Sequence, residues 1–167
     1  KGSLLLVQVV GTDDDPRFTV HRGDTGEDLA DDHPANVAHW IDRLPETLGY
    51  LVVVHRTGKA TSFGIGVEEP RELFFDAETA VAEVSLNVPA NASVAYVVPP
   101  SQLIKADLKS GPRDAYVTLE AVDSGQQLLK ADRGSRTYRG APSRPEEVIL
   151  RVHQGTEAGD ITLHVER

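Results

Sequence analysis

The sequence predicts an all-β protein made of two tandem antiparallel β-sandwich, jelly-roll-like repeats. Three observations lead to this prediction. Apolar and polar residues alternate with period 2 in short segments, clusters of Gly, Asp, Pro and Thr separate these segments, and the two halves of the chain share a register of matching residues. A period of 2 places one face of a strand against a core, and many short strands at regular spacing are typical of sandwiches.

The alternating segments run along the whole chain of 167 residues. They cover residues 4–10, 18–22, 50–56, 63–69, 72–76, 81–88, 93–98, 103–108, 115–122, 146–153 and 161–166. Residues 36–43 are the helix-like candidate, but their Trp40–Ile41 pair suits a strand or a turn equally well. We therefore expect little helix.

The repeat can be followed residue by residue. RFTVHRGDTGEDL (17–29) aligns with YVTLEAVDSGQQL (116–128), and the offset then shortens by one residue and stays constant to the end of the chain. The matched pairs include Thr19 with Thr118, Asp24 with Asp123, Gly26 with Gly125, Trp40 with Tyr138, and His55 with His153. Such a register indicates a tandem duplication, and we place the domains at 1–69 and 70–167.

The two predicted repeats are unequal in length. Residues 71–100 precede the matched region of the second repeat, and the first repeat has no counterpart of them after Lys1. The first repeat is therefore expected to lack its N-terminal strands in this chain. An open sheet edge can pair with another strand, which predicts homo-association through the incomplete first repeat.

Composition excludes several classes of function. A net charge of −9 argues against nucleic acid and anionic membranes as partners, since both need a basic face. No apolar run of about 20 residues is present, so we expect no membrane insertion. The absence of Cys excludes disulfides, thiolate metal sites and Cys nucleophiles. The opening KGSLLLVQVV is too short for a signal peptide, so we expect the signal of an exported protein to have been removed already.

Residues 40–67 carry a resemblance to a known family. WIDRLPETLGYLVVVHRTGKATSFGIGV resembles the ending Gly-x-Tyr-x-Val-x-Val … Tyr-x-Leu-x-Val of the bacterial pre-peptidase C-terminal domain, and the second copy keeps this ending with Val148 in place of the Tyr. Gly2-Ser3 and Ser101-Gln102 each half-match its Gly-Gln position. The resemblance implies a non-catalytic β-sandwich module of secreted proteins that accompanies peptidases and other hydrolases. Some relatives bind collagen or polysaccharide, some bind calcium, and a related sandwich is a periplasmic inhibitor of goose-type lysozyme.

Two Asp-Thr/Ser-Gly triplets allow a catalytic alternative. Asp24-Thr25-Gly26 and Asp123-Ser124-Gly125 are what a duplicated aspartic protease needs, because two carboxylates sharing a proton activate a water. The chain is about half the length of a bilobal enzyme, and charged residues flank the first triplet. Both triplets are also good turn sequences, with Asp bonding to its own backbone and Gly taking a positive φ.

Other candidate site residues lie where the two repeats match or differ. Trp40 and Tyr138 share a position and are candidate ligand-binding residues, with a role in the core as the other interpretation. Asp13, Asp14 and Asp15 are candidate calcium ligands, although their loop lacks EF-hand spacing. Asp31, Asp32, His33 and His39 are weaker candidates for zinc. His55 and His153 occupy equivalent positions, which favours a structural role.

The sequence thus predicts a non-catalytic accessory binding or spacer module of a secreted, periplasmic or cell-surface bacterial protein. It predicts no cofactor other than calcium, and a protein or polysaccharide partner. One alternative is an enzyme inhibitor of the lysozyme-inhibitor kind, for which the charge of −9 suits a cationic target. A further alternative is an aspartic protease that uses Asp24 and Asp123.

Overall fold

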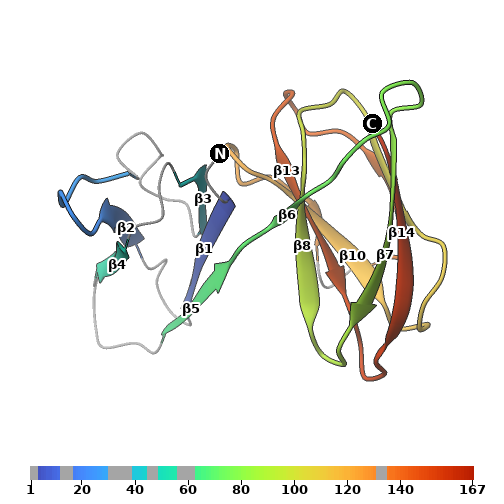
Figure 1. The fold of residues 1–167 in the computed structure, drawn as a ribbon, viewed down its shortest axis with the longest axis horizontal. Coiled ribbons are helices and arrows are strands. Elements are labelled where there is room, and N and C mark those ends of the chain that lie inside the picture. The colour runs from blue at the N-terminus through green and yellow to red at the C-terminus, as the bar shows by residue number, and fades with distance from the viewer. Residues whose placement is uncertain (1–3, 12–16, 30–38, 45–48, 56–62, 131–134) are drawn as a thin grey trace. The chain divides into compact units, whose positions relative to one another are not determined.

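The computed structural model describes residues 4–11, 17–29, 39–44, 49–55, 63–130 and 135–167 (Figure 1). Within these ranges the secondary structure consists of β-strands, and this confirms the predicted all-β class. These ranges contain no helix that could cross a membrane. The chain divides into two compact units, Lys1–Glu69 and Pro70–Arg167.

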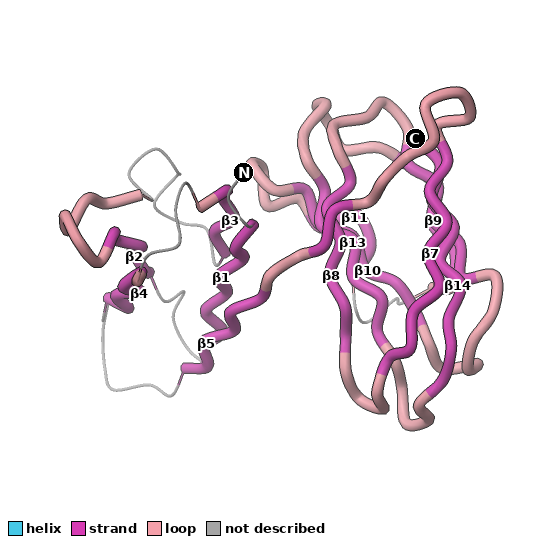
Figure 2. Tube along the Cα trace, in the orientation of Figure 1, coloured by secondary structure: helices cyan, strands magenta, loops and turns pink. Residues whose placement is uncertain are grey.

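The unit Pro70–Arg167 is a sandwich of two sheets (Figures 1 and 2). One sheet has the order β11 (Gln127–Leu129), β10 (Tyr116–Ala121), β13 (Val148–His153), β8 (Ser93–Val98) and β6 (Arg71–Glu72). The other has the order β12 (Thr137–Gly140), β9 (Ile104–Leu108), β14 (Gly159–Glu166) and β7 (Val81–Val88). Neighbouring strands are antiparallel, except for β6 and β8, which are parallel.

The core of this unit lies between the inner faces of the two sheets. Every second residue of a strand points inward, so each strand supplies alternate apolar side chains to one cluster. The cluster includes Leu86 of β7, Tyr96 of β8, Leu119 of β10, Leu150 of β13 and Leu163 of β14. The period-2 pattern of the sequence thus becomes a continuous buried layer.

The unit Lys1–Glu69 contains five strands among its described residues. β1 (Leu4–Gly11) lies between β3 (His39–Arg43) and β5 (Phe63–Glu68), and β2 (Arg17–Arg22) pairs with β4 (Tyr50–His55). All of these pairs are antiparallel. Val7, Val20 and Trp40 form a buried cluster, so the aromatic side chain of β3 packs inside this unit.

Two strand pairs, one in each unit, have matching registers. Arg17 lies opposite His55 between β2 and β4, and Tyr116 lies opposite His153 between β10 and β13. These are the positions that the sequence repeat aligns. The match concerns the two strand pairs, and the duplication of the whole repeat stays a prediction.

The structure corrects some of the predicted elements. Residues 72–76 were expected to form a strand, but β6 ends at Glu72 because the chain there leaves its sheet. Of residues 36–43, a helix-like candidate that suited a strand or a turn equally well, residues 39–43 form β3, and 36–38 lie outside the described residues. The short strands β11 and β12 were not predicted, since three or four residues show too little alternation.

Candidate binding surface

A crossover segment, residues 73–80, joins the two sheets of the second unit. Figure 1 shows it running from β6 in one sheet to the start of β7 in the other. Leu73 is buried, and Phe75 packs against the core under the Arg167 guanidinium, 4.7 Å from the ring centroid. Phe74 lies between these two anchored residues with 85% of its surface exposed. The crossover thus holds a large aromatic side chain in solvent.

A turn after Phe75 fixes the end of the crossover. Asp76 Oδ1 accepts hydrogen bonds from the Glu78 N–H at 3.0 Å and from the N–H and hydroxyl of Thr79, both at 2.9 Å. These bonds, led by the backbone donor of Thr79, hold the pKa of Asp76 below its ordinary value. Ala80 closes the turn with φ at 54°, a left-handed conformation that is unfavourable for alanine.

A cleft of about 490 Å³ lies beside Phe74 within this unit. Its lining residues come from the crossover and from strands of both sheets: Arg71, Glu72, Phe74, Glu83, Val84 and Tyr96. Tyr96 is 2% exposed, and its hydroxyl has no hydrogen-bond partner among the described residues. A buried hydroxyl normally has a partner. This hydroxyl lies below the surface, and the cleft itself can accept an apolar side chain.

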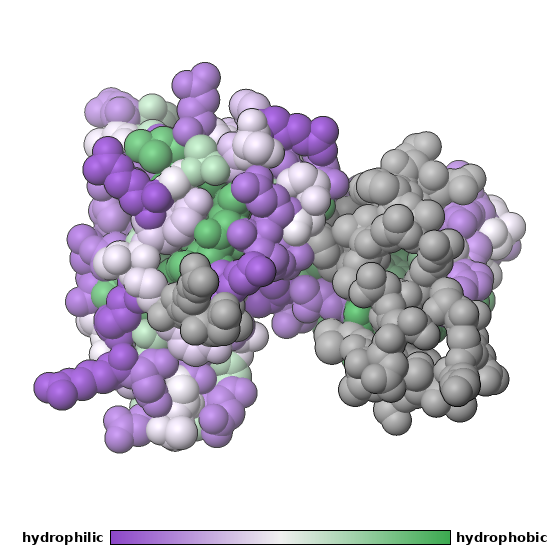
Figure 3. Space-filling model, turned by 180° about the vertical axis from the view of Figure 1, so that it is seen from behind, coloured by the Kyte–Doolittle hydropathy of each residue, from purple (hydrophilic) through white to green (hydrophobic). Residues whose placement is uncertain are grey.

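The surroundings of the cleft are acidic. Around the crossover, Arg71 and the Arg167 guanidinium over Phe75 are the basic groups, against the exposed carboxylates of Glu72, Asp76, Glu78 and Glu83. In the view of Figure 3, hydrophilic residues cover most of the described surface of the second unit, and apolar residues show as a narrow band between them. An exposed Phe74 in acidic surroundings is suited to a partner with both apolar and basic groups.

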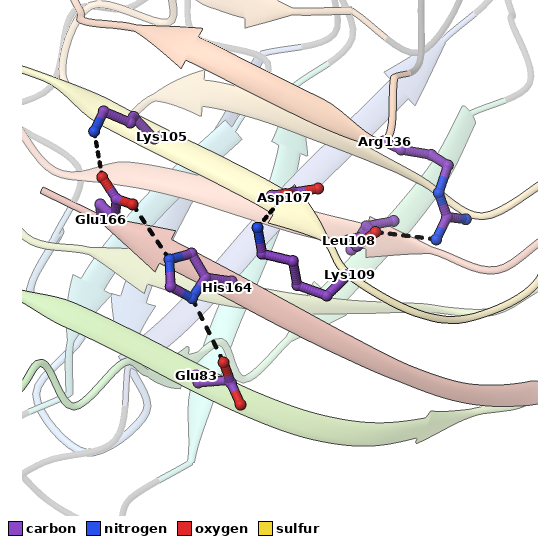
Figure 4. A network of polar contacts seen from close by, with 8 residues as sticks. All are labelled: Glu83, Lys105, Asp107, Leu108, Lys109, Arg136, His164 and Glu166. Atoms are coloured by element: carbon purple, nitrogen blue, oxygen red, sulfur yellow. Dashed lines mark hydrogen bonds and ion pairs between the residues drawn. The ribbon is translucent and has the colours of Figure 1, made fainter.

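The outer face of the four-stranded sheet has a ladder of paired charges (Figure 4). Glu166 forms an ion pair with Lys105 of β9 and a hydrogen bond with His164 Nε2 at 3.4 Å, and Glu83 Oε2 lies 3.5 Å from His164 Nδ1. Lys105 and then His164 hold the pKa of Glu166 below its ordinary value. These side chains link three neighbouring strands to one another, so we regard the ladder as a stabilising feature of the sheet.

Two further residues drawn in Figure 4, Lys109 and Arg136, form stabilising contacts in the same sheet. Lys109 Nζ lies 2.6 Å from Asp107 Oδ2, and this carboxylate raises the pKa of Lys109. The Arg136 guanidinium donates to the Leu108 carbonyl at 3.1 Å, as Figure 4 shows, and also to the Ser110 carbonyl at 3.0 Å. Arg136 thereby fixes the loop after β9 and is engaged by the protein itself.

The two Asp-Thr/Ser-Gly triplets form turns. Gly26 and Gly125 have φ of 71° and 64°, the left-handed region that glycine accepts readily. Asp24 is paired with Arg22 at 3.2 Å, and this guanidinium lowers the pKa of Asp24. The geometry explains both triplets as hairpin turns and assigns Asp24 a partner other than a second carboxylate.

The second turn is held by a buried carboxylate. Glu146 has a fully buried side chain, and it accepts hydrogen bonds from the backbone N–H of Ser124 at 2.8 Å and from its hydroxyl at 2.7 Å. Burial alone would raise the pKa of Glu146, but the two Ser124 donors and the Arg144 charge outweigh it and lower the pKa. Glu146 is thus a structural group of the 123–125 turn, and the sequence alone did not single it out.

His55 and His153 have equivalent contacts. Thr19 Oγ1 lies 3.0 Å from His55 Nε2, and Thr118 Oγ1 lies 2.8 Å from His153 Nε2. The His153 ring also stacks on Tyr116, with centroids 4.6 Å apart. Each histidine therefore ties neighbouring strands together, in line with the structural role expected from the repeat.

The structure places the two aromatic candidates in different surroundings. Trp40 is 3% exposed and belongs to the core of the first unit. Tyr138 is half-buried, packs against the core of the second unit, and has a pKa raised by this burial. The two residues lie in separate units. Their role in ligand binding stays a prediction.

The metal candidates fall mostly outside the described residues. Asp13, Asp14 and Asp15 lie there, as do Asp31, Asp32 and His33, while His39 is the first residue of β3. Over the ranges that the structure does describe, no group of three His, Asp or Glu side chains is arranged to hold a metal ion. The calcium hypothesis for residues 13–15 therefore stays a prediction.

Phe74 was missed in the sequence, although a signal for it exists. Residues 72–76 read ELFFD, with two adjacent phenylalanines. Adjacent residues of an extended chain point to opposite sides, so both rings cannot enter one core. One phenylalanine of such a pair is expected to be exposed or to meet a second apolar surface.

The sequence matches no protein-family model and no curated protein. Solved structures similar to this chain include PliG of Aeromonas hydrophila, described as a periplasmic lysozyme inhibitor of g-type lysozyme. The similarity has a TM-score of 0.47 and 14% sequence identity, and it covers 58% of this chain and 94% of PliG. A likeness at this level identifies no family.

Proposed function

We propose that this chain is a non-catalytic binding protein of the secreted or periplasmic space, and that its target is a cationic protein. The observation that carries the proposal is Phe74, held out in solvent beside a cleft and surrounded by carboxylates. Large aromatic residues that are exposed next to a pocket supply much of the binding energy in protein interfaces.

The charge of the chain supports the same target class. A net charge of −9 speeds encounter with a cationic partner and disfavours acidic ones. The strongest polar clusters of the second unit, the charge ladder and the Glu146 turn, are engaged in internal contacts that stabilise the fold. This leaves the exposed Phe74 and its acidic surroundings as the best-supported contact surface.

The specific form of the proposal is an inhibitor of the lysozyme kind. PliG is described as an inhibitor of g-type lysozyme, and the resemblance of the sequence to the pre-peptidase C-terminal domain led to the same alternative, for which the charge of −9 suits a cationic target. The resemblance to the pre-peptidase C-terminal domain adds a second form, in which the chain is an accessory module attached to a hydrolase. Both forms are non-catalytic, and they differ in whether binding changes the activity of the target.

An inhibition assay tests the proposal. The purified chain at micromolar concentration would be added to goose-type and to chicken-type lysozyme, with cytochrome c as a basic control protein that carries no such activity. We expect stoichiometric inhibition of one lysozyme, weakened on the order of tenfold or more by Phe74→Ala, because truncating an interface aromatic costs at least that much. Lys109→Ala, a change in an ion pair on the outer sheet face, serves as the matched control.

Three outcomes would count against the proposal. Absence of binding to either lysozyme removes the lysozyme form of it. If the chain binds cytochrome c as tightly as lysozyme, and high salt abolishes both interactions, the binding is unspecific charge attraction. Retention of the chain on peptidoglycan, chitin, cellulose or collagen, with no lysozyme capture, favours an accessory module instead.

A further inference from the structure

The edge of the four-stranded sheet next to the cleft is a long strand. β7 is the outermost strand of this sheet and has eight residues, whereas the other outer strands of the unit, β6, β11 and β12, have two, three and four. Its register against β14 is continuous from Val81 to Val88. Natural edges are usually protected by Pro, charged residues, a bulge or short length, and of these VAEVSLNV has only the charge of Glu83.

The hydrogen bonds of Thr162 show which main-chain groups of β7 face outward. In an antiparallel pair, residues alternate between those that bond across the pair and those that point away from it. The Thr162 carbonyl accepts the Lys109 N–H at 2.9 Å, and the Thr162 N–H donates to Ser110 Oγ at 3.0 Å, so both groups point away from β7. Ser85 lies opposite Thr162, and its N–H and C=O therefore point to the outer side of β7.

The same alternation applies along the strand. Glu83 and Asn87 lie two residues from Ser85, so their main-chain groups also point outward. The Val81 carbonyl, on the same side, already accepts the Asp76 N–H at 2.8 Å, which shows that this edge bonds to chain placed beside it. Three consecutive outward positions thus offer three donors and three acceptors at strand spacing.

The outward positions and the cleft share residues. Glu83 and Val84 of β7 line the cleft together with Phe74 and Tyr96. A strand added beside β7 would place alternate side chains on the inner side of the sheet, where this cleft lies. The main-chain groups can bind a backbone, and the cleft can bind one of its apolar side chains.

We propose that β7 is a docking edge for an extended, basic segment of the partner protein, which adds as a fifth strand to the four-stranded sheet. The inference rests on the proposed function and specifies its contact. The segment has alternating apolar and basic residues, with an apolar side chain in the cleft beside Phe74 and a Lys or Arg near Glu83. Main-chain bonds supply affinity, and the cleft and the acidic surroundings supply selection.

Net charge favours a basic partner segment over a second copy of the chain as the strand that pairs with β7. Pairing of two β7 strands would bring together two acidic crossovers and two chains of charge −9 each. A basic segment instead places positive charge beside the exposed carboxylates of Asp76 and Glu78 and beside Glu83, which also contacts His164. A polysaccharide would not match the alternating N–H and C=O groups at strand spacing.

Amide hydrogen exchange of the full chain tests the proposal directly. The probe is a peptide Lys-Val-Lys-Val-Lys-Val-Lys with blocked ends, at millimolar concentration. We expect exchange at Glu83, Ser85 and Asn87 to slow on the order of tenfold or more, because their N–H groups become hydrogen-bonded. A peptide of the same charge with an N-methyl group on every residue, and a second peptide with Glu in place of Lys, should give no protection.

Ser85→Pro provides the matched variant. It removes one outward N–H that the sheet does not use, so the fold should be retained by circular dichroism while peptide protection is lost. Ser85→Ala keeps the N–H and should behave as the unchanged chain. If Ser85→Pro fails to fold, the N-methylated peptide still tests the edge.

The inference is overturned if the three amides exchange unchanged at millimolar peptide, or if the N-methylated peptide binds equally well. Protection that rises with protein concentration in the absence of peptide would assign the edge to a second copy. Lysozyme inhibition unaffected by Ser85→Pro would uphold the proposed function and reject this edge. Peptide protection without lysozyme binding would uphold the edge and reject the lysozyme target.

Discussion

The buried carboxylate of Glu146 shows most directly how a single residue stabilises this fold. Glu146 is fully buried and receives two hydrogen bonds from Ser124 in the 123–125 turn. Its ionised form is favoured in the folded state despite burial, because the two donors and Arg144 compensate for the lost water. The turn and the carboxylate therefore depend on each other.

Glu146→Gln should lower the free energy of unfolding at pH 7 by about 1.5–3 kcal/mol, the range for hydrogen bonds to a charged group. Because the folded pKa of Glu146 is lower than its unfolded value of 4.5, its stabilisation is present above that value and is lost as the pH falls below it. The difference between the two proteins should therefore shrink on acidification. Urea unfolding of both proteins from pH 7 to pH 3 measures it, with Glu157→Gln, an exposed residue, as the control. A difference that stays constant with pH would contradict the assignment.

Ala80 is a second position where a single residue affects the free energy of unfolding. Its φ of 54° places a Cβ in the left-handed region, at the end of the crossover that carries Phe74. Ala80→Gly should raise the free energy of unfolding by about 0.5 kcal/mol, since relief of strain exceeds the added entropy of the unfolded chain. Ala77→Gly, in the same turn without a positive φ, should lower it. Thermal unfolding of both variants checks the prediction, and a loss of stability in Ala80→Gly would contradict it.

The strands of this protein differ in how clearly the sequence specifies them. β7 and β8 have the residues that the alternation predicted, because each has one apolar face against the core and enough residues to show the period. β11 and β12 are too short to show it. Residues 72–76 have a strand-like composition, yet the parallel bond of β6 to β8 ends at Glu72 and the chain crosses to the other sheet. A crossover depends on the distant strands that it joins, and local composition does not contain that information.

The features of the candidate site also differ in whether the sequence alone could predict them. The turns at Gly26 and Gly125 could be predicted, since glycine after Asp-Thr or Asp-Ser has a local preference. The open edge of β7 could not, because it depends on the order of strands in the sheet, and the Phe74-Phe75 pair indicated only that one of the two rings is exposed or meets a second apolar surface. Residues that are close in space through strand order alone leave no pattern in a single sequence.

Strand β13 should be the most sensitive element of the second unit. It lies between β10 and β8 at the centre of its sheet, and Leu150 on its inner face is 0% exposed. Leu150→Ala should lower the free energy of unfolding by about 2–5 kcal/mol, through lost transfer energy and the cavity left behind. Leu103→Ala, at a position that is 37% exposed outside the strands, should cost less than about 1 kcal/mol. Urea denaturation compares the two, and equal losses would contradict the central role of β13.

At the scale of the whole molecule, the second unit has its own core. The buried cluster that includes Leu150 and Leu163 consists of residues from Leu73 to Val165 only, and the candidate surface at Phe74 and β7 belongs to the same unit. A unit with its own core and two packed sheets has the features of an independent domain. The acidic crossover also lies within it, so charge, cleft and edge would stay together if the unit were separated.

We therefore predict that residues 70–167 fold on their own and retain the binding properties of the full chain. The fragment should give dispersed amide signals in an NMR spectrum and a single cooperative unfolding transition, because both sheets and the intervening core are complete within it. Its exchange protection by the lysine–valine peptide should equal that of the full chain within about twofold, since Glu83, Ser85 and Asn87 keep their surroundings. A folded fragment without protection would show that residues 1–69 contribute to the binding surface. An unfolded fragment would show that the second unit needs the first for its stability. The two units, whose strand pairs β2–β4 and β10–β13 share a register, would then unfold as one cooperative structure.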